Sequence, residues 1–483
     1  MTRRSRGRFV SGTGGGNGDD ADMRIVLIFL GLLLPGRALA HTSEGAFVLL
    51  LPTGHYIAGG VATVAVTVLL MALLPARRAE AIFRPVPLHR VGRRGRRPWP
   101  SLLSLLVLLC ALWMGRTGSQ DPTINALPLL VWTGFWLFLV SLQAVVGDIW
   151  RVLNPWTGLW ALAGRRAWLN YPRGLGRWPG LVSLMAFAAF LLADIAPAAP
   201  ERLALAAGGY WAFHMAGTLI FGLRWLLSAE ALTILMRAYA GLAPVGRRRG
   251  RRSLGLPGWR WMARPAPPMA LAVVMIALLG IGSFDGINET FWWLARIGMN
   301  PLEFTGRSAV TIQTLTGLFL SVGLLVAVFA ATLQTGMILA EGEEGGAGRG
   351  GLAHAFRVFA PTILPIAIAY HVAHYLTAML VEGQYLALYL NDPFRQGWHL
   401  LGIEARHVTT GFFNTRATVQ VIFLAQAGTV VLGHVLAILM AHVLALRLYG
   451  DGRRALLSQL PLAAFMIAYT LFGLWLLASP RGA

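Results

Sequence analysis

Residues 365–385 read PIAIAYHVAHYLTAMLVEGQY and belong to a longer apolar run. A helix needs about 20 mostly apolar residues to cross a bilayer, so this run predicts a transmembrane helix. Its polar residues are His371, His374, Tyr375 and Glu382. At roughly 100° per residue, the last three lie within about 60° of His371 and form one stripe. Polar groups at this depth usually face the interior of a bundle and indicate a functional site.

The composition excludes an ordinary soluble domain. Hydrophobic residues make up 56% of the chain and charged residues 13%, whereas soluble proteins average about 25% charged residues. Several other apolar runs are also long enough to span a membrane. The sequence therefore predicts an all-α, polytopic transmembrane helix bundle, with a single domain over residues 41–483.

Apolar segments alternate with polar loops, and we expect about ten spanning helices. They cover approximately residues 55–75, 101–115, 127–147, 179–199, 203–223, 267–284, 308–338, 358–382, 418–446 and 459–478.

The arginines predict the orientation of these helices. All 41 basic residues are arginine, and 27 fall in one set of alternate loops, mainly 76–100, 148–178 and 224–266, against eight in the other set. Cytoplasmic loops carry the excess of positive charge, so we expect a bacterial inner-membrane protein with both mature termini in the periplasm. The net charge of +21 is explained in this way and does not indicate nucleic-acid binding.

Three further segments carry expectations of their own. Residues 225–243 have helical spacing with two charges, which predicts an amphipathic helix lying at the membrane interface. The outer loops 285–307 and 385–417 mix aromatic and charged residues, and we expect short helices there that form a lid or vestibule.

The N-terminal region is expected to lie outside the bundle. Residues 1–22 are Gly-rich and polar, typical of disorder or of a mis-assigned start. Residues 23–40 resemble a secretory signal peptide, with a short apolar core and the small residues Ala38 and Ala40 before the cleavage site. Cleavage there would leave His41 at the mature N-terminus, where its amino group and imidazole could bind copper together with His55. Alternatively, His41 is incidental.

Histidines from several spans are expected at one depth. Counting about 1.5 Å per residue places His214, His371, His374 and His434 just outside the midplane. Imidazole is the commonest metal ligand, so these side chains are candidate ligands for a divalent transition metal, Zn or Cu. Single membrane histidines, however, are more often hydrogen-bond partners between helices.

Carboxylates and amides approach the same level. Asp285 and Glu382 are candidates for a further ligand or a general base, and Gln384 and Gln426 are candidates for substrate binding. The single Cys110 excludes a cysteine metal cluster and a disulfide framework.

Several motifs together resemble bacterial integral-membrane proteins named fenitrothion hydrolases. The motifs are DIWRVLNPWTGLW (148–160), YPRGLGRWPG (171–180), IGSFDG (281–286), PIAIAYHVAHY (365–375), EGQ (382–384), NDPFRQGW (391–398) and GHVLAILMAH (433–442). The resemblance implies hydrolysis of an organophosphorus ester. It points to Asp285, His374, Tyr375, Gln384, His434 and His442 as site residues.

The polar residues within the membrane and the resemblance together suggest two possible functions. The first is a metal-dependent hydrolase of lipophilic, organophosphorus-type esters that enter from the outer leaflet. The second is a transporter coupled to protons or to a metal ion such as copper. The hydrolase predicts that His374, His434 and a carboxylate converge, whereas the transporter predicts polar residues continuing to the cytoplasmic face past Gln143, Gln334 and His442.

The expected partners are the lipid bilayer and a small lipophilic substrate or ion, and the oligomeric state stays open.

Overall fold

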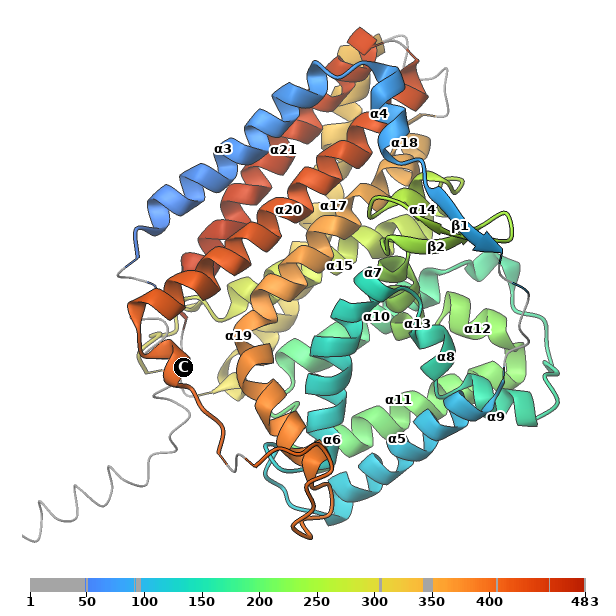
Figure 1. Ribbon diagram of the computed structural model, residues 1–483, viewed down its shortest axis with the longest axis vertical. Coiled ribbons are helices and arrows are strands. Elements are labelled where there is room, and N and C mark those ends of the chain that lie inside the picture. Colours follow the sequence, from blue (N-terminus) through green and yellow to red (C-terminus); the bar gives the residue numbers. More distant parts are fainter. Residues whose placement is uncertain are drawn as a thin grey trace, which may run out of the picture.

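The computed structural model describes residue 48 and residues 51–90, 92, 97–303, 306–341, 351–404, 407–450 and 452–481. The expected signal peptide and His41 lie outside these residues. Within the described part of the chain, nine helices are long and apolar enough to cross a membrane, and Figure 1 shows that helices make up nearly all of the fold. The predicted bundle of apolar helices is therefore confirmed, with nine helices among the described residues that could cross a membrane instead of about ten and a small β-sheet beside them.

The nine spans follow the predicted order. They are α3 (Thr53–Ala72), α5 (Trp99–Thr117), the continuous helix of α6 (Ala126–Pro128), π-helix η1 (Leu129–Leu139) and α7 (Val140–Val146), α11 (Pro200–Phe221), α15 (Met269–Asn288), η3 (Arg307–Val310) with α17 (Thr311–Glu341), α18 (Gly351–Phe359) with η5 (Ala360–Ile363) and α19 (Leu364–Asn391), α20 (Arg416–Tyr449) and α21 (Gly452–Ala478). Shorter helices join them: α4 (Ala76–Ile82), α8 (Trp150–Leu153), α9 (Thr157–Leu162), η2 (Arg173–Leu175), α10 (Trp178–Ala193), α12 (Leu223–Ser228), α13 (Ala231–Ala240), α14 (Trp259–Met262), α16 (Phe291–Arg296) and η6 (Gly411–Phe413).

The remaining expected span, residues 179–199, corresponds to α10, which has only 16 residues. It ends at Asp194, whose carboxylate accepts two hydrogen bonds from Arg202 at the start of α11, Nε to Oδ1 at 3.0 Å and Nη2 to Oδ2 at 2.6 Å. The bidentate pair lowers the pKa of Asp194 below its ordinary value. Because this charged pair begins the turn into α11, α10 is shorter than the predicted segment 179–199.

The spans differ in how much protein surrounds them. In the most apolar window of α15, 78% of the residues are buried inside the protein, against 6% in α3. Figure 1 shows α3 at the edge of the bundle, beside α21 and α20. Since a span buried by protein on most sides has little surface left for lipid, α15 forms the centre of the bundle and α3 its lipid-facing periphery.

The Arg-rich loops meet at one end of the bundle. β1 (Val86–Arg90) and β2 (Val245–Arg248) each pair antiparallel with β3 (Arg251–Leu254), which gives the strand order β1-β3-β2. Val86 and Val245 are both opposite Leu254. The sheet joins two loops that were expected on one side of the membrane, 76–100 and 224–266.

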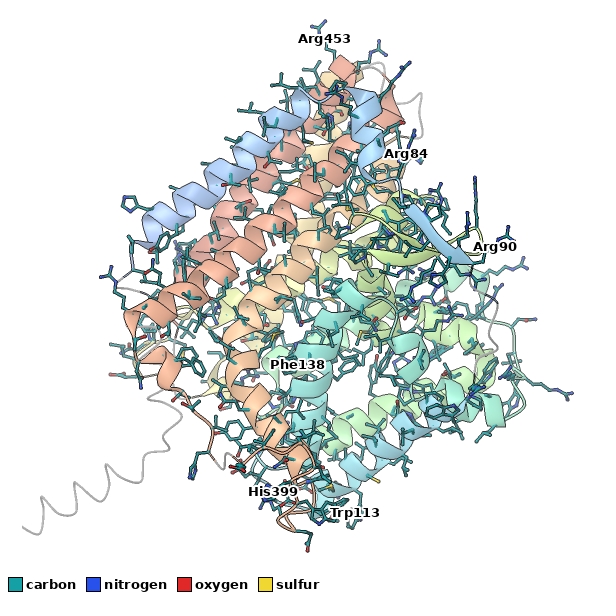
Figure 2. All side chains as sticks on the ribbon, viewed as in Figure 1. Arg84, Arg90, Trp113, Phe138, His399 and Arg453 are labelled. Atoms are coloured by element: carbon teal, nitrogen blue, oxygen red, sulfur yellow. The ribbon has the colours of Figure 1, made fainter. Side chains whose placement is uncertain are left out.

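Contacts at the opposite end agree with this arrangement. Thr290, after α15, forms an antiparallel bridge with Arg481, after α21, and Gln420 near the start of α20 donates to the Tyr56 hydroxyl of α3 at 2.9 Å. In Figure 2, Arg84, Arg90 and Arg453 project from the Arg-rich end, and Trp113 and His399 lie at the far side of the molecule. The start of α3 and the end of α21 therefore share one end of the bundle.

Residues 225–243 do not form the expected interfacial helix, so that prediction is wrong. The segment is divided between α12 and α13, and nearly every residue of α13 is buried. The division falls at Glu230, whose carboxylate caps α13 by accepting from the amides of Leu232 at 2.8 Å and Thr233 at 2.6 Å. The hydroxyl of Tyr210 donates to Glu230 Oε1 at 2.5 Å. Because the carboxylate has three donors, it can be buried inside the protein rather than at an interface.

Replacing Glu230 by alanine is expected to lower the free energy of unfolding by about 2–4 kcal/mol, since the change removes a helix cap and leaves the buried Tyr210 hydroxyl without its acceptor. The measurement is denaturant unfolding of the purified protein in mixed micelles. Glu201→Gln is the control, because its ion pair with Arg116 spans 3.6 Å between half-exposed side chains and such pairs contribute about 1 kcal/mol or less. Equal losses in the two variants would contradict this role for Glu230.

Candidate functional site

Asp285 of α15 and two consecutive residues of α19 form a compact buried group, here called the Asp285 cluster. His374 Nε2 lies 3.2 Å from Asp285 Oδ2, and the Tyr375 hydroxyl donates to the same oxygen at 2.5 Å. Asp285 is 9% exposed and His374 8%. Two of the residues expected on the polar stripe of 365–385 therefore meet one carboxylate inside the bundle.

Arg481 completes the Asp285 cluster. Its Nη2 lies 3.4 Å from His374 Nδ1. A guanidinium can only donate, so Nδ1 is the acceptor, and the ring proton on Nε2 points to Asp285. The bridge to Thr290 and the hydrogen bond from the Phe291 amide to the Pro480 carbonyl at 3.1 Å hold this segment across the end of α15. Sequence reasoning missed Arg481, because a single arginine after the last span carries no signal of a site 107 residues away.

Tyr370 covers the other side of the imidazole. Its ring stacks on His374 with 5.8 Å between centroids and 14° between planes. The absence of a side chain at Gly286 makes room for the Tyr370 hydroxyl, which a Cβ at that position would overlap. This hydroxyl is buried and has no hydrogen-bond partner among the described residues, a condition typical of a site for ordered water.

His371 does not join the Asp285 cluster through a hydrogen bond. Its Nε2 lies 3.1 Å from the Trp136 carbonyl oxygen of η1. The ring makes edge-on contacts with Trp136 and Tyr375, at centroid distances of 5.2 and 5.0 Å. His371 therefore connects two helices, which is the alternative stated for single membrane histidines.

His214 lies in a different group between α10, α11 and α12. Its Nε2 is 3.2 Å from Ser183 Oγ, and its Nδ1 accepts from Trp225 Nε1 at 3.0 Å. With both nitrogens hydrogen-bonded and 1% of the side chain exposed, His214 is a buried link between helices.

His434 is also buried, and its Nδ1 lies 2.9 Å from the Val430 carbonyl oxygen of its own helix. Its ring lies 6.5 Å from that of Tyr469 on α21, and the Tyr469 hydroxyl is 2.5 Å from Ser283 Oγ on α15. His434 Nε2 has no partner within the described part of the chain. Two turns further along α20, His442 lines a small cavity with Gln459.

The remaining candidates have other contacts. Gln426 donates to the Ala373 carbonyl oxygen of α19 at 2.9 Å and so joins α20 to α19. Gln384 bonds both the amide and the carbonyl of Thr409, at 2.9 and 3.0 Å, and so attaches the outer loop to α19. Glu382 lies on the same part of α19, half-buried, beyond the Asp285 cluster. Of the three expected catalytic residues, Asp285 and Tyr375 are in contact. Glu382 lies further along α19, outside the Asp285 cluster.

The histidines expected as joint metal ligands have separate partners. No group of three or more His, Cys, Asp or Glu side chains suited to a metal ion occurs in the described ranges. The Asp285 cluster offers two such donors, and Arg481 places a positive charge against the second imidazole nitrogen, Nδ1. The donor set therefore does not fit a three-ligand zinc or copper site.

The fold and the site define a class: a multi-pass helical membrane protein with a carboxylate and an imidazole paired between its central spans. Comparisons with protein-family models, curated proteins and solved structures found no match. The resemblance to fenitrothion hydrolases stays a prediction.

Proposed function

We propose that this protein is a proton-coupled transporter of the bacterial inner membrane and that the Asp285 cluster is its proton-binding site. The observation that carries the proposal is the contact between Asp285 and His374 inside the membrane-spanning bundle. Isolated charges are expensive at this depth, and ionisable residues there commonly form proton relays. An imidazole beside a carboxylate can accept a proton from water, and the carboxylate then balances the positive charge of the protonated ring.

A series of polar groups supports passage towards the Arg-rich end. Tyr370 stacks on His374, and further towards that end Ser283 contacts Tyr469, whose ring lies 6.5 Å from that of His434. The Tyr370 hydroxyl and His434 Nε2 lack partners among the described residues, so water molecules bonded to both would join the gaps. His442 and Gln459 follow on the same two helices, α20 and α21.

The distribution of the arginines indicates the side of the membrane from which protons reach the site. If the Arg-rich end faces the cytoplasm, as the positive-inside rule requires, the start of α3 and Arg481 face the periplasm. The Asp285 cluster then lies nearer the periplasm, and protons reach it from that side.

Ester hydrolysis is the second candidate, and Arg481 is the observation that favours it. A guanidinium 3.4 Å from an imidazole could stabilise negative charge on a phosphoryl or acyl oxygen while His374 acts as general base. Because the donor set does not fit a metal site, the residues available for this reaction are His374 and Arg481.

The test uses the protein in liposomes on a solid-supported membrane, where a pH jump drives charge movement without a known substrate. We expect a transient current from the wild type and a loss of at least about 90% in His374→Gln, because the imidazole binds the proton. His399→Gln is the matched control, since His399 is exposed at the outer end (Figure 2).

Equal currents from wild type and His374→Gln would contradict the proton site. Hydrolysis of an aryl phosphotriester that is lost in His374→Gln, without any pH-jump current in the wild type, would replace the transporter by the second candidate.

A further inference from the structure

A cavity of about 250 Å³ opens at the Arg-rich end of the bundle, between α13, α14 and the start of α15. A single water molecule needs only about 10–15 Å³ of such space, so the cavity has room for a small anion together with water. Its lining includes the four arginines Arg177, Arg237, Arg260 and Arg264 and a single carboxylate, Asp148. We call it the arginine cavity.

Within the part of the chain that the structure describes, none of the four arginines forms an ion pair. Every carboxylate ion pair of the described residues involves other side chains. Arg260 Nη1 instead donates to the Ala240 carbonyl oxygen at 2.6 Å, and the guanidinium of Arg264 lies over the Trp261 ring at 4.9 Å from its centroid. Backbone and ring contacts therefore hold two of the guanidinium groups beside the cavity and leave other N–H donors for a ligand.

The pKa values of three of these guanidinium groups are lowered, which reflects burial and the closeness of the positive charges. Burial, followed by the charges of Arg260 and Arg237, lowers the pKa of Arg264 to about 10. Burial and the charge of Arg237 also lower the pKa of Arg177. Asp148 raises the pKa values of Arg260 and Arg264, but a single carboxylate cannot balance four guanidinium groups. A bound anion would relieve this repulsion.

Two helix starts add to the positive potential. α10 begins directly after Arg177, and α15 begins after the Pro265–Pro268 segment that lines the cavity. The free N–H groups of a helix N-terminus attract anions. Apolar side chains, including Leu227 and Leu271, form another part of the lining, so a ligand with a carbon skeleton also fits.

We infer that the arginine cavity binds a phosphate group, carried either by an anionic lipid headgroup or by a water-soluble phosphate. Guanidinium groups bind phosphate through paired N–H donors, with a geometry that an ammonium group lacks. This site is separate from the Asp285 cluster and does not depend on the proposed proton transport.

The test uses the full-length protein in nanodiscs of zwitterionic lipid. Thermal unfolding is followed during titration with inorganic phosphate, with chloride adjusted to keep the ionic strength constant. In the second arm, native mass spectrometry measures the phosphatidic acid retained by protein taken from nanodiscs that contain it. We expect saturable binding in at least one arm, weakened about tenfold or more in Arg237→Gln/Arg264→Gln, because charge-assisted hydrogen bonds are lost.

Arg252→Gln is the control, because Arg252 is exposed on β3 and does not line the cavity; its binding should stay within about twofold of the wild type. If the double glutamine variant does not fold, Arg264→Lys replaces it and should bind with intermediate strength, since charge is kept but the paired donors are lost. Binding in the first arm assigns a soluble phosphate, and retention in the second arm alone assigns a lipid headgroup. No saturable binding in either arm, or an equal loss in Arg252→Gln, would overturn the inference.

Discussion

Gly336→Ala is expected to destabilise the bundle by about 2–3 kcal/mol, the cost of overpacking a closely packed contact. Gly336 lies on α17 against the backbone of α21, and a methyl group there would overlap the carbonyl oxygen of Ser458. A backbone carbonyl cannot move aside by changing rotamer, so the two helices must separate. Small residues at such positions let transmembrane helices approach closely.

Gly323→Ala is the matched control on the same helix. A Cβ at Gly323 meets nothing within 4 Å, so alanine there should stabilise the helix by up to about 1 kcal/mol. Denaturant unfolding in mixed micelles measures both variants. A Gly336→Ala protein as stable as the Gly323→Ala protein would show that the contact between α17 and α21 does not limit stability.

Asp285→Asn is expected to remove at least about 90% of the pH-jump current while the protein stays folded. The amide has nearly the same shape as the carboxylate, and its oxygen can still accept the Tyr375 hydroxyl that lies 2.5 Å from Asp285 Oδ2. It cannot, however, carry the negative charge that balances a protonated His374. Asp285→Glu keeps the charge but moves it by one methylene, so part of the current should remain.

Asp121→Asn is the control for this charge. Asp121 is exposed in the loop after α5, where its carboxylate accepts from the Thr123 amide at 2.8 Å. Its current should match that of the wild type. If Asp285→Asn keeps the full current and the wild-type stability, Asp285 is neither a proton site nor a partner that His374 requires.

The sequence predicted most of the spans, and part of the candidate site, for a physical reason. The length of an apolar run determines whether it crosses a bilayer, and counting along a helix gives depth. Counting residues along the predicted helices placed Asp285 near the level of His374 and Tyr375. The structure places these three residues in contact. The same counting put His214 at this level, yet it belongs to a group with Ser183 and Trp225.

What could not be predicted depends on how the helices are arranged around one another. Residues at one depth can lie on opposite sides of a bundle, and a single sequence does not say which spans are neighbours. Arg481 reaches His374 only because the segment after α21 folds across the end of α15. The helical spacing and two charges of residues 225–243 predicted an interfacial helix, whereas Tyr210 and two amides satisfy one of these charges, Glu230, inside the protein.

The order of strands in the small sheet has a consequence for biosynthesis. β1 ends at Arg90, and its partner β3 begins at Arg251, so the ribosome must add about 160 residues before the pair can form. At about 5–20 residues per second, β1 waits roughly 8–32 s with its backbone donors and acceptors open to other chains. Arg90, which is exposed in the folded sheet, places a charge on this edge, and charged residues disfavour the pairing of an open edge with other chains.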